Sequence, residues 1–196
     1  VDRDGGGYPG TFLDVVAASE ALRKHGNKYG LATQRVVAVG HSAGGHLALW
    51  LAARERISRS SRLYSTTPLP IAAAISLGGL PDLEAAQVPP GDTCGAEPVR
   101  RLVGLAGEGR SDPYADTSPA AMFPFSSRQV LINASRDRIA PPSFAEAYAA
   151  KAQKHGAGVQ RVTVPDEGHV ELIAPGTSSW AAAVVEIRKA LGLPAD

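Results

Sequence analysis

The stretch VVAVGHSAGGHLALWLA, residues 36–52, decides the fold class of this chain. It begins with a short β-branched run and ends in an apolar run rich in helix formers, which predicts a buried strand followed at once by a helix. Between them, residues 40–44 read Gly-His-Ser-Ala-Gly and match the pattern G-x-S-x-G. In this context the pattern is typical of a sharp turn that holds up a nucleophilic serine, Ser42.

The residue types at this turn have a chemical explanation. A serine at such a turn adopts an unfavourable backbone conformation, and we expect side chains at the flanking Gly40 and Gly44 to clash. The helix N-terminus behind Ser42 favours negative charge, and the backbone N–H of Ala43 is placed to meet a developing oxyanion. The alternative is a glycine-rich turn that only makes a tight connection, but the flanking strand and helix favour the nucleophile.

Composition predicts a soluble globular chain of one domain, residues 1–196. Hydrophobic residues make up 44%, charged residues 20%, and the net charge is +1, so nothing electrostatic favours nucleic acid or a membrane surface. No apolar run reaches the ~18 residues that a transmembrane helix needs. The single cysteine, Cys94, cannot form an internal disulfide, and no Cys/His cluster has zinc spacing. Residues 1–10 do not resemble a signal peptide, so we expect a cytoplasmic protein.

Predicted strands and helices alternate along the chain, which indicates an α/β fold with a mostly parallel sheet flanked by helices. The strands are expected at residues 35–40, 71–79, 128–135 and 159–165, and the helices at 9–25, 43–56, 98–105, 141–156 and 178–192. Residues 84–125 belong to a long irregular stretch, 80–127, that interrupts the alternation. We expect them to lie over the carboxyl ends of the strands as a cap or insertion and to help set acyl-chain preference.

A nucleophilic serine needs a base, and His169 is the best candidate among five histidines. It follows the fourth predicted strand in the loop DEGHVELI, where the carboxyl ends of parallel strands gather ligands. His41 adjoins the serine, and we expect its side chain to point away from it. His46 is expected to pack or cap on the following helix. His25 and His155 lie at helix C-termini, where a cation suits the helix dipole.

The base needs an acid to orient it, and Asp137 fits best because it directly follows the third predicted strand. Asp166 is close to the histidine in sequence but more plausibly shapes its own loop. Asp82 follows the second strand and is an occasional alternative. Asp112 and Asp116 lie in the irregular stretch. The order along the chain is then serine, aspartate, histidine.

Several segments together resemble the α/β-hydrolase superfamily, more narrowly the esterases and arylformamidases near its hormone-sensitive-lipase-like and prolyl-oligopeptidase-like branches. The resemblance implies a serine hydrolase of small carboxylic esters that forms an acyl-enzyme and uses no metal or organic cofactor. It implies Ser42 as nucleophile, Asp137 as acid, His169 as base and the Ala43 amide as an oxyanion donor. The segments are DGGGYPGTFLDVVAA (4–18), GHSAGGHLALWLA (40–52), SLGGLPDL (76–83), SPAAMFP (118–124), SRDRIAPP (135–142) and EGHVELI (167–173).

The sequence departs from that family in two places. It has no His-Gly-Gly motif for the other oxyanion donors, and glycines 5–7 match a later loop of the family, so only the second half of its eight-stranded sheet is recognised. Ala134-Ser135 stands where the family usually has His-Gly. Two other functions therefore remain open: hydrolysis of an aryl formamide such as N-formylkynurenine, and a catalytically impaired fragment with a role in binding or assembly.

The recognised half-sheet has a consequence for association. In the full family the strand before the nucleophile pairs on both sides, whereas this chain offers no obvious upstream partner for residues 35–40. Arg35 is the only charged residue in that strand. A sheet edge that carries no proline and little charge promotes pairing with another strand. We expect residues 35–40 to pair with a strand outside these 196 residues or with a second copy in a homo-oligomer.

Overall fold

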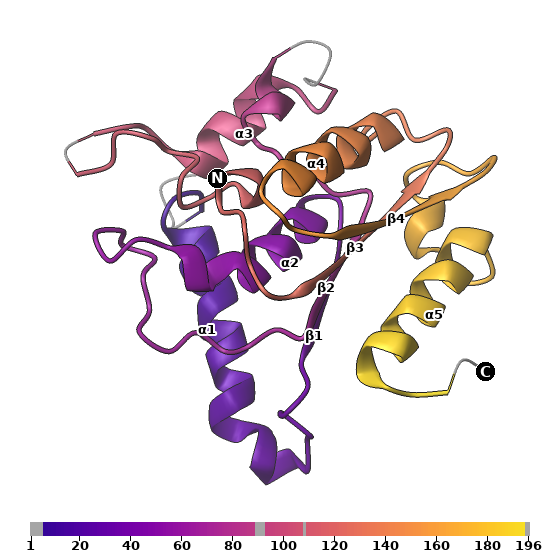
Figure 1. The fold of residues 1–196 in the computed structure, drawn as a ribbon, viewed down its shortest axis with the longest axis horizontal. Coiled ribbons are helices and arrows are strands. Elements are labelled where there is room, and N and C mark those ends of the chain that lie inside the picture. Colours follow the sequence, from indigo (N-terminus) through magenta and orange to yellow (C-terminus); the bar gives the residue numbers. More distant parts are fainter. Residues whose placement is uncertain (1–5, 89–92, 108, 195–196) are drawn as a thin grey trace.

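The computed structural model describes residues 6–88, 93–107 and 109–194 and contains one parallel sheet, in chain order (Figure 1). Its strands are β1 (Val37–His41), β2 (Ala73–Leu77), β3 (Arg128–Ala134) and β4 (Val159–Val164). Every neighbouring pair is parallel, so the carboxyl ends of all the strands meet at one edge. This confirms the predicted fold class. The second strand is shorter than the predicted 71–79, since Gly78 leaves extended backbone with a φ of 53°.

The helices are α1 (Gly10–His25), α2 (Ala43–Ala53), α3 (Ala96–Val103), α4 (Pro142–Lys154) and α5 (Ser178–Leu191). The helix predicted at 43–56 is in fact α2 followed by a 3₁₀ turn, Arg54–Arg56. The helix predicted at 98–105 begins two residues earlier and ends at Val103, because the following Gly104 has a φ of 71°. None of the helices in the described ranges combines the length and apolar character needed to cross a membrane.

Helices cover both faces of the sheet (Figure 1), and apolar side chains pack together on each face. On one face, α1, α2 and α4 pack around the fully buried Phe12, Trp50 and Tyr148. On the other, α5 packs through Ala183 against residues such as Ile132 of β3. The strands β2 and β3 are buried on both faces, which explains why their sequences are almost continuously apolar.

A third apolar cluster forms around α3 and places that helix near the carboxyl edge of the sheet. Val99 and Val103 of α3 pack with Leu80 and Leu83, from the segment after β2, and with Ala140, from the segment after β3. The segment predicted to cap the site therefore packs against the loops that leave the strand ends. Residues 89–92 and 108 of that segment lie outside the described residues.

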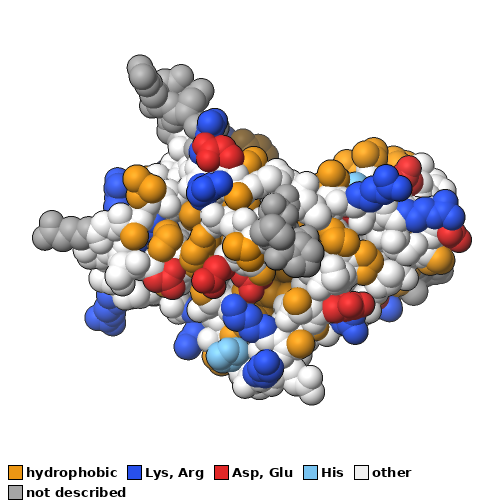
Figure 2. Space-filling view, turned by 90° about the horizontal axis from the view of Figure 1, so that it is seen from above, with side chains coloured by type: hydrophobic (Ala, Val, Ile, Leu, Met, Phe, Trp, Pro, Cys, Tyr) orange, Lys and Arg blue, Asp and Glu red, His pale blue; other side chains and the backbone are white. Residues whose placement is uncertain are grey.

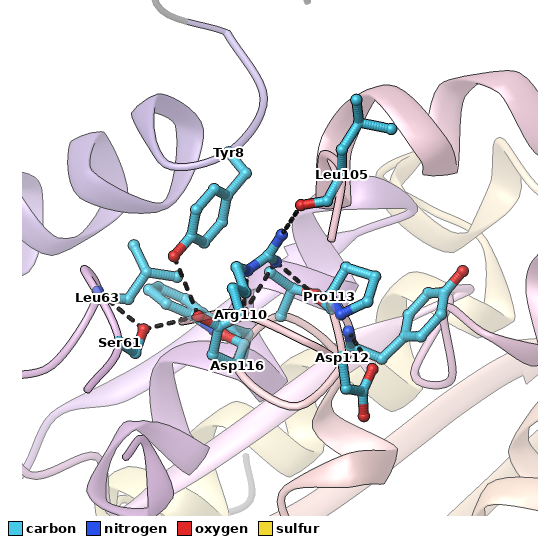
Figure 3. A network of polar contacts seen from close by, with 11 residues as sticks. Tyr8, Ser61, Leu63, Leu105, Arg110, Asp112, Pro113 and Asp116 are labelled. Carbon is cyan, nitrogen blue, oxygen red and sulfur yellow. Dashed lines mark hydrogen bonds and ion pairs between the residues drawn. The ribbon is translucent and has the colours of Figure 1, made fainter. Parts of the chain in front are cut away.

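The part of this segment that contains Arg110 and Asp116 is held in place by a buried ionic network centred on Asp116 (Figure 3). Arg110 donates two hydrogen bonds to Asp116 Oδ1, and the hydroxyls of Tyr8 and Ser61 donate to Oδ2. The Arg110 guanidinium also lies 3.6 Å from the centre of the Tyr8 ring, and Trp50 Nε1 donates to the Asp116 carbonyl. Asp116, considered from sequence as a candidate acid, instead joins this loop to Tyr8 before α1, to Trp50 of α2 and to Ser61 after it.

The strand β1 forms one edge of the sheet. Among the described residues it pairs with β2 alone, and Val39 on this strand keeps 42% of its surface exposed. Unpaired backbone groups beside an apolar side chain form a template for another strand. The edge expected from the sequence is therefore open in this structure.

We expect the isolated 196-residue chain to self-associate through β1. Substituting Val39→Lys places a charge on the edge and should disfavour pairing. Size-exclusion chromatography with light scattering over a concentration series should show species larger than the monomer for the wild type and a larger monomer fraction for the variant. Val88→Lys, at an exposed valine elsewhere, is the control and should behave as the wild type does. A soluble, fully active wild-type monomer at every concentration would contradict the prediction.

Candidate active site

Ser42 joins β1 to α2 with a strained backbone. Its φ of 55° and ψ of −122° lie in a region that non-glycine residues rarely adopt, at a cost of about 1–3 kcal/mol. Hydrogen bonds on both sides hold this conformation: the Ser42 N–H donates to the Leu77 carbonyl at 2.9 Å, and the Ser42 carbonyl accepts from the N–H groups of Gly45 and His46. The turn thus has the geometry that the sequence motif predicts.

The glycines around Ser42 make different demands on space. A Cβ on Gly40 would lie 2.0 Å from the carbonyl oxygen of Gly44, so this position tolerates no side chain. A Cβ on Gly44 would have no neighbour within 4 Å, so the expected clash at that flank is wrong. The second close contact is one residue later, where a Cβ on Gly45 would lie 2.7 Å from the Ser76 hydroxyl of β2.

An acid–base pair lies at the same edge of the sheet. His169 Nδ1–H donates to Asp137 Oδ2 at 2.7 Å, and the side chain of Asp137 is fully buried. The other carboxylate oxygen, Oδ1, accepts the backbone N–H groups of Ile139 and Ala140, each at 2.8 Å. A carboxylate so fixed holds the imidazole in the tautomer whose Nε2 carries the lone pair, as a general base requires.

Gly78 at the end of β2 leaves the room that this pair occupies. A Cβ there would lie 3.0 Å from Asp137 Oδ2, 3.1 Å from His169 Nδ1 and 2.7 Å from a methyl carbon of Leu172. Its φ of 53° is a second reason for glycine. Gly78, after β2, therefore leaves space for Asp137 and His169, which follow β3 and β4.

The loop that carries His169 is fastened to the start of α5 through Glu167. The Glu167 carboxylate accepts the N–H groups of Ser178 and Ser179 at 2.8 and 2.9 Å, and its carbonyl accepts the N–H of Arg136. Hydrogen bonding from Ser179 and Ser178 lowers the pKa of Glu167. These contacts join the loop that carries His169 to the start of α5 and to Arg136 after β3.

The contact that would complete a triad is not made in this structure. Among the contacts of the described residues, none joins the Ser42 hydroxyl to the His169 ring; hydrogen bonds of this type often tighten only when substrate binds. His41, the residue before the serine, has its ring centre 4.4 Å from that of His169. No local pattern in the sequence signals this contact.

The remaining three histidines considered from the sequence make no contact with Asp137 or His169 among the described residues. His46 is buried on α2, where Nδ1 is 3.2 Å from the Leu80 carbonyl, and burial lowers its pKa to about 4. His25 is the last residue of α1, and His155 caps the C-terminus of α4. These placements agree with the packing and terminal roles expected for them.

The other candidate acids have structural partners. Asp82 accepts the Ala85 N–H and forms an ion pair with Lys151. Asp166 is exposed and pairs with Arg136, and Asp112 accepts the N–H of Tyr114. Among the described residues, no group of three or more His, Cys, Asp or Glu side chains is placed to hold a metal ion.

A cavity of about 340 Å³ opens beside Ser42 and Ala43. Figure 2 views the molecule from the α3 side, where hydrophobic side chains gather toward the middle of the face among scattered charged ones. The cavity wall is largely apolar, which suits the acyl part of a small ester. Its apolar lining includes Leu47 of α2, Leu80 and Leu83, and Pro98, Val99 and Leu102 of α3. A larger hollow of about 490 Å³ borders the Asp116 network and contains none of the predicted catalytic residues.

Comparison with known proteins identifies both a family and a fold. A family model described as BD-FAE matches residues 4–151. A truncated carbohydrate esterase from gut microbiota is similar with a TM-score of 0.65 and 22% identity, over 83% of this chain and 62% of that one. Esterase 2 of Thermogutta terrifontis, phosphoramylated by tabun, gives a TM-score of 0.70 and 18% identity, over 99% and 69%.

A third solved structure has a similar fold at a similar level of sequence identity. The acetyl ester-xyloside bifunctional hydrolase of Caldicellulosiruptor lactoaceticus has a TM-score of 0.69 and 20% identity, over 96% of this chain and 68% of that one. No curated protein matches the chain. At these identities the likenesses establish the fold, and the chain spans 62–69% of the length of the three structures.

The two flanking glycines of the motif provide a matched test of the turn. Gly40→Ala should lower the free energy of unfolding by more than about 2 kcal/mol, since backbone atoms must move to admit the methyl group. Gly44→Ala should leave stability unchanged or raise it by up to about 1 kcal/mol, because alanine favours the helix. Urea unfolding followed by circular dichroism measures both. Equal effects at the two positions would show that the turn is built differently.

Proposed function

The chain belongs to the BD-FAE family, and from that premise we propose that it is a serine hydrolase of small carboxylic esters. One observation carries the proposal: a strained serine, a buried Asp–His pair and an apolar cavity share the carboxyl edge of the sheet. Ser42 would be the nucleophile, His169 the general base and Asp137 the acid that orients it. The Ala43 N–H, at the start of α2, would donate to the oxyanion.

The structural neighbours support the same chemistry in similar folds. Solved forms of the Thermogutta terrifontis esterase 2 include one with butyrate bound and one phosphorylated by paraoxon. Butyrate is a short apolar acid, and the cavity beside Ser42 has space and an apolar wall for an acyl group of that kind. This favours esters with short apolar acyl groups as substrates.

The reaction would proceed in two half-reactions. In the first, Ser42 Oγ bonds to the ester carbonyl carbon while its proton passes to His169 Nε2, and the carbonyl oxygen becomes an oxyanion. The bond to the alcohol then breaks, and the alcohol leaves with the proton from His169. In the second, water attacks the acyl-enzyme, gives a proton to His169, and releases the acid as Ser42 recovers its proton. Asp137 stabilises the imidazolium in both.

The apolar cavity beside Ser42 favours a hydrolase over a catalytically impaired fragment, and each of the two functions left open by the sequence has its own test. An aryl formamide would use the same serine, acid and base, so it belongs in the substrate panel beside the esters. A catalytically impaired fragment would bind without turnover. One oxyanion donor, the Ala43 N–H, is identified at the site, and an oxyanion donor contributes about 10²–10³-fold to rate.

Ser42→Ala should abolish hydrolysis of p-nitrophenyl butyrate. Removal of a triad serine costs up to about 10⁶-fold in kcat in a well-studied serine protease, and we expect a loss of at least about 10³-fold here. Ser111→Ala, which removes an exposed serine in the loop after α3, is the control and should keep wild-type rates. The assignment of Ser42 is wrong if the alanine variant keeps most of the activity.

The wall formed by α3 should set acyl-chain preference. Leu102→Trp would fill the cavity from α3, so kcat/KM for hexanoate should fall at least about tenfold relative to acetate, because one methylene in an apolar pocket is worth about 1–3 kcal/mol. Arg100→Trp changes an exposed residue of the same helix and serves as the matched control. An unchanged hexanoate-to-acetate ratio in Leu102→Trp would place the acyl group elsewhere.

A further inference from the structure

His41, the last residue of β1, makes two contacts with His169 across 128 positions of sequence. Its Nε2 lies 2.9 Å from the main-chain carbonyl oxygen of His169. The two rings also pack against each other, with centres 4.4 Å apart and planes inclined by 44°. One side chain therefore contacts both the backbone and the imidazole of the proposed base.

The chemistry of the first contact fixes the state of the His41 ring. A carbonyl oxygen can only accept, so Nε2 of His41 carries a proton and donates it. Burial lowers the pKa of His41 below its ordinary value of 6.5 and outweighs the hydrogen bond to the His169 carbonyl, which raises it. The ring is accordingly neutral at pH 7, and it adds no positive charge beside the imidazolium that would form on His169 during catalysis.

The His169 loop has other contacts besides those from His41. Asp137 holds Nδ1 of the ring, and Glu167 fastens the loop to the start of α5. The next residue, Val170, is 67% exposed and provides no wall. His41, next to Ser42 in the chain, holds the main chain of the loop at His169 itself.

We propose that His41 is a positioning residue: its hydrogen bond to the His169 carbonyl and its ring packing set the distance between the proposed base and Ser42. The proposal rests on the proposed function, since it concerns the same serine and base. The proposal gives His41 no bond to substrate and no share in the proton transfer. Its effect passes through His169, and it belongs to the turn that carries the nucleophile, so the two halves of the site move as one unit.

Kinetics of two variants test the role in turnover. His41→Ala removes both contacts and should lower kcat about 10–100-fold with KM nearly unchanged, because displacing a reacting group by about 1 Å can cost 10²-fold. His41→Gln keeps an N–H donor at a similar reach and should recover kcat to within about threefold of wild type. His25→Ala, at the end of α1, is the control. A wild-type kcat in His41→Ala, or no recovery in His41→Gln, would overturn the proposal.

A readout that needs no activity separates this proposal from the proposed function. The proton shared by His169 Nδ1 and Asp137 Oδ2 should give a downfield resonance in proton NMR, assigned by its loss in His169→Gln. We expect the resonance to be sharp in the wild type and in His41→Gln, and shifted or broadened in His41→Ala. If His41→Ala does not fold, His41→Phe takes its place, since it keeps a ring but loses the donor.

The outcomes then distinguish the two claims. A resonance that changes with loss of the His41 donor supports the positioning role even when the wild-type protein hydrolyses no ester, in which case the proposed function fails alone. A resonance identical in the wild type, His41→Ala and His41→Phe would overturn the positioning role, even in an active esterase.

Discussion

The candidate site depends on one close approach of backbone to backbone, where β1 turns into α2 at Ser42. The space between Gly40 and the Gly44 carbonyl admits no side-chain atom, and the hydrogen bond from the Ser42 N–H to Leu77 ties the turn to β2. Such strain persists only where surrounding contacts over-determine it. The apolar core around Trp50 beneath α2 supplies that support. The strained, half-buried position of the serine is thus maintained by the packing of the whole sheet.

The acid–base pair follows from the same topology. Because all the strands are parallel, the loops after β3 and β4 start at the same edge of the sheet as the turn at Ser42. Gly78, after β2, leaves space for these loops. Burial of the Asp137 side chain excludes water from its bond to His169, and two backbone N–H groups stabilise the carboxylate. Each member of the site is therefore held by a strand end, which is more rigid than a free loop.

Much of this could be predicted from the sequence, because the deciding signals are local. Apolar runs of strand length between helical segments predict the parallel sheet, and the serine turn is written in consecutive residues. What could not be predicted depends on distant contacts. That Gly45, and not Gly44, meets a neighbour depends on how α2 packs on β2, and the His41–His169 contact joins residues 128 positions apart. The role of Asp116 likewise depends on residues from three separate segments.

The central claim is that the strained serine is a nucleophile activated by His169. Mass spectrometry of the intact chain after reaction with a fluorophosphonate, followed by peptide mapping, tests it most directly. The account predicts a single adduct on Ser42 that forms at neutral pH and forms far more slowly in His169→Gln. An unlabelled wild-type chain, or an adduct on another residue, would contradict it.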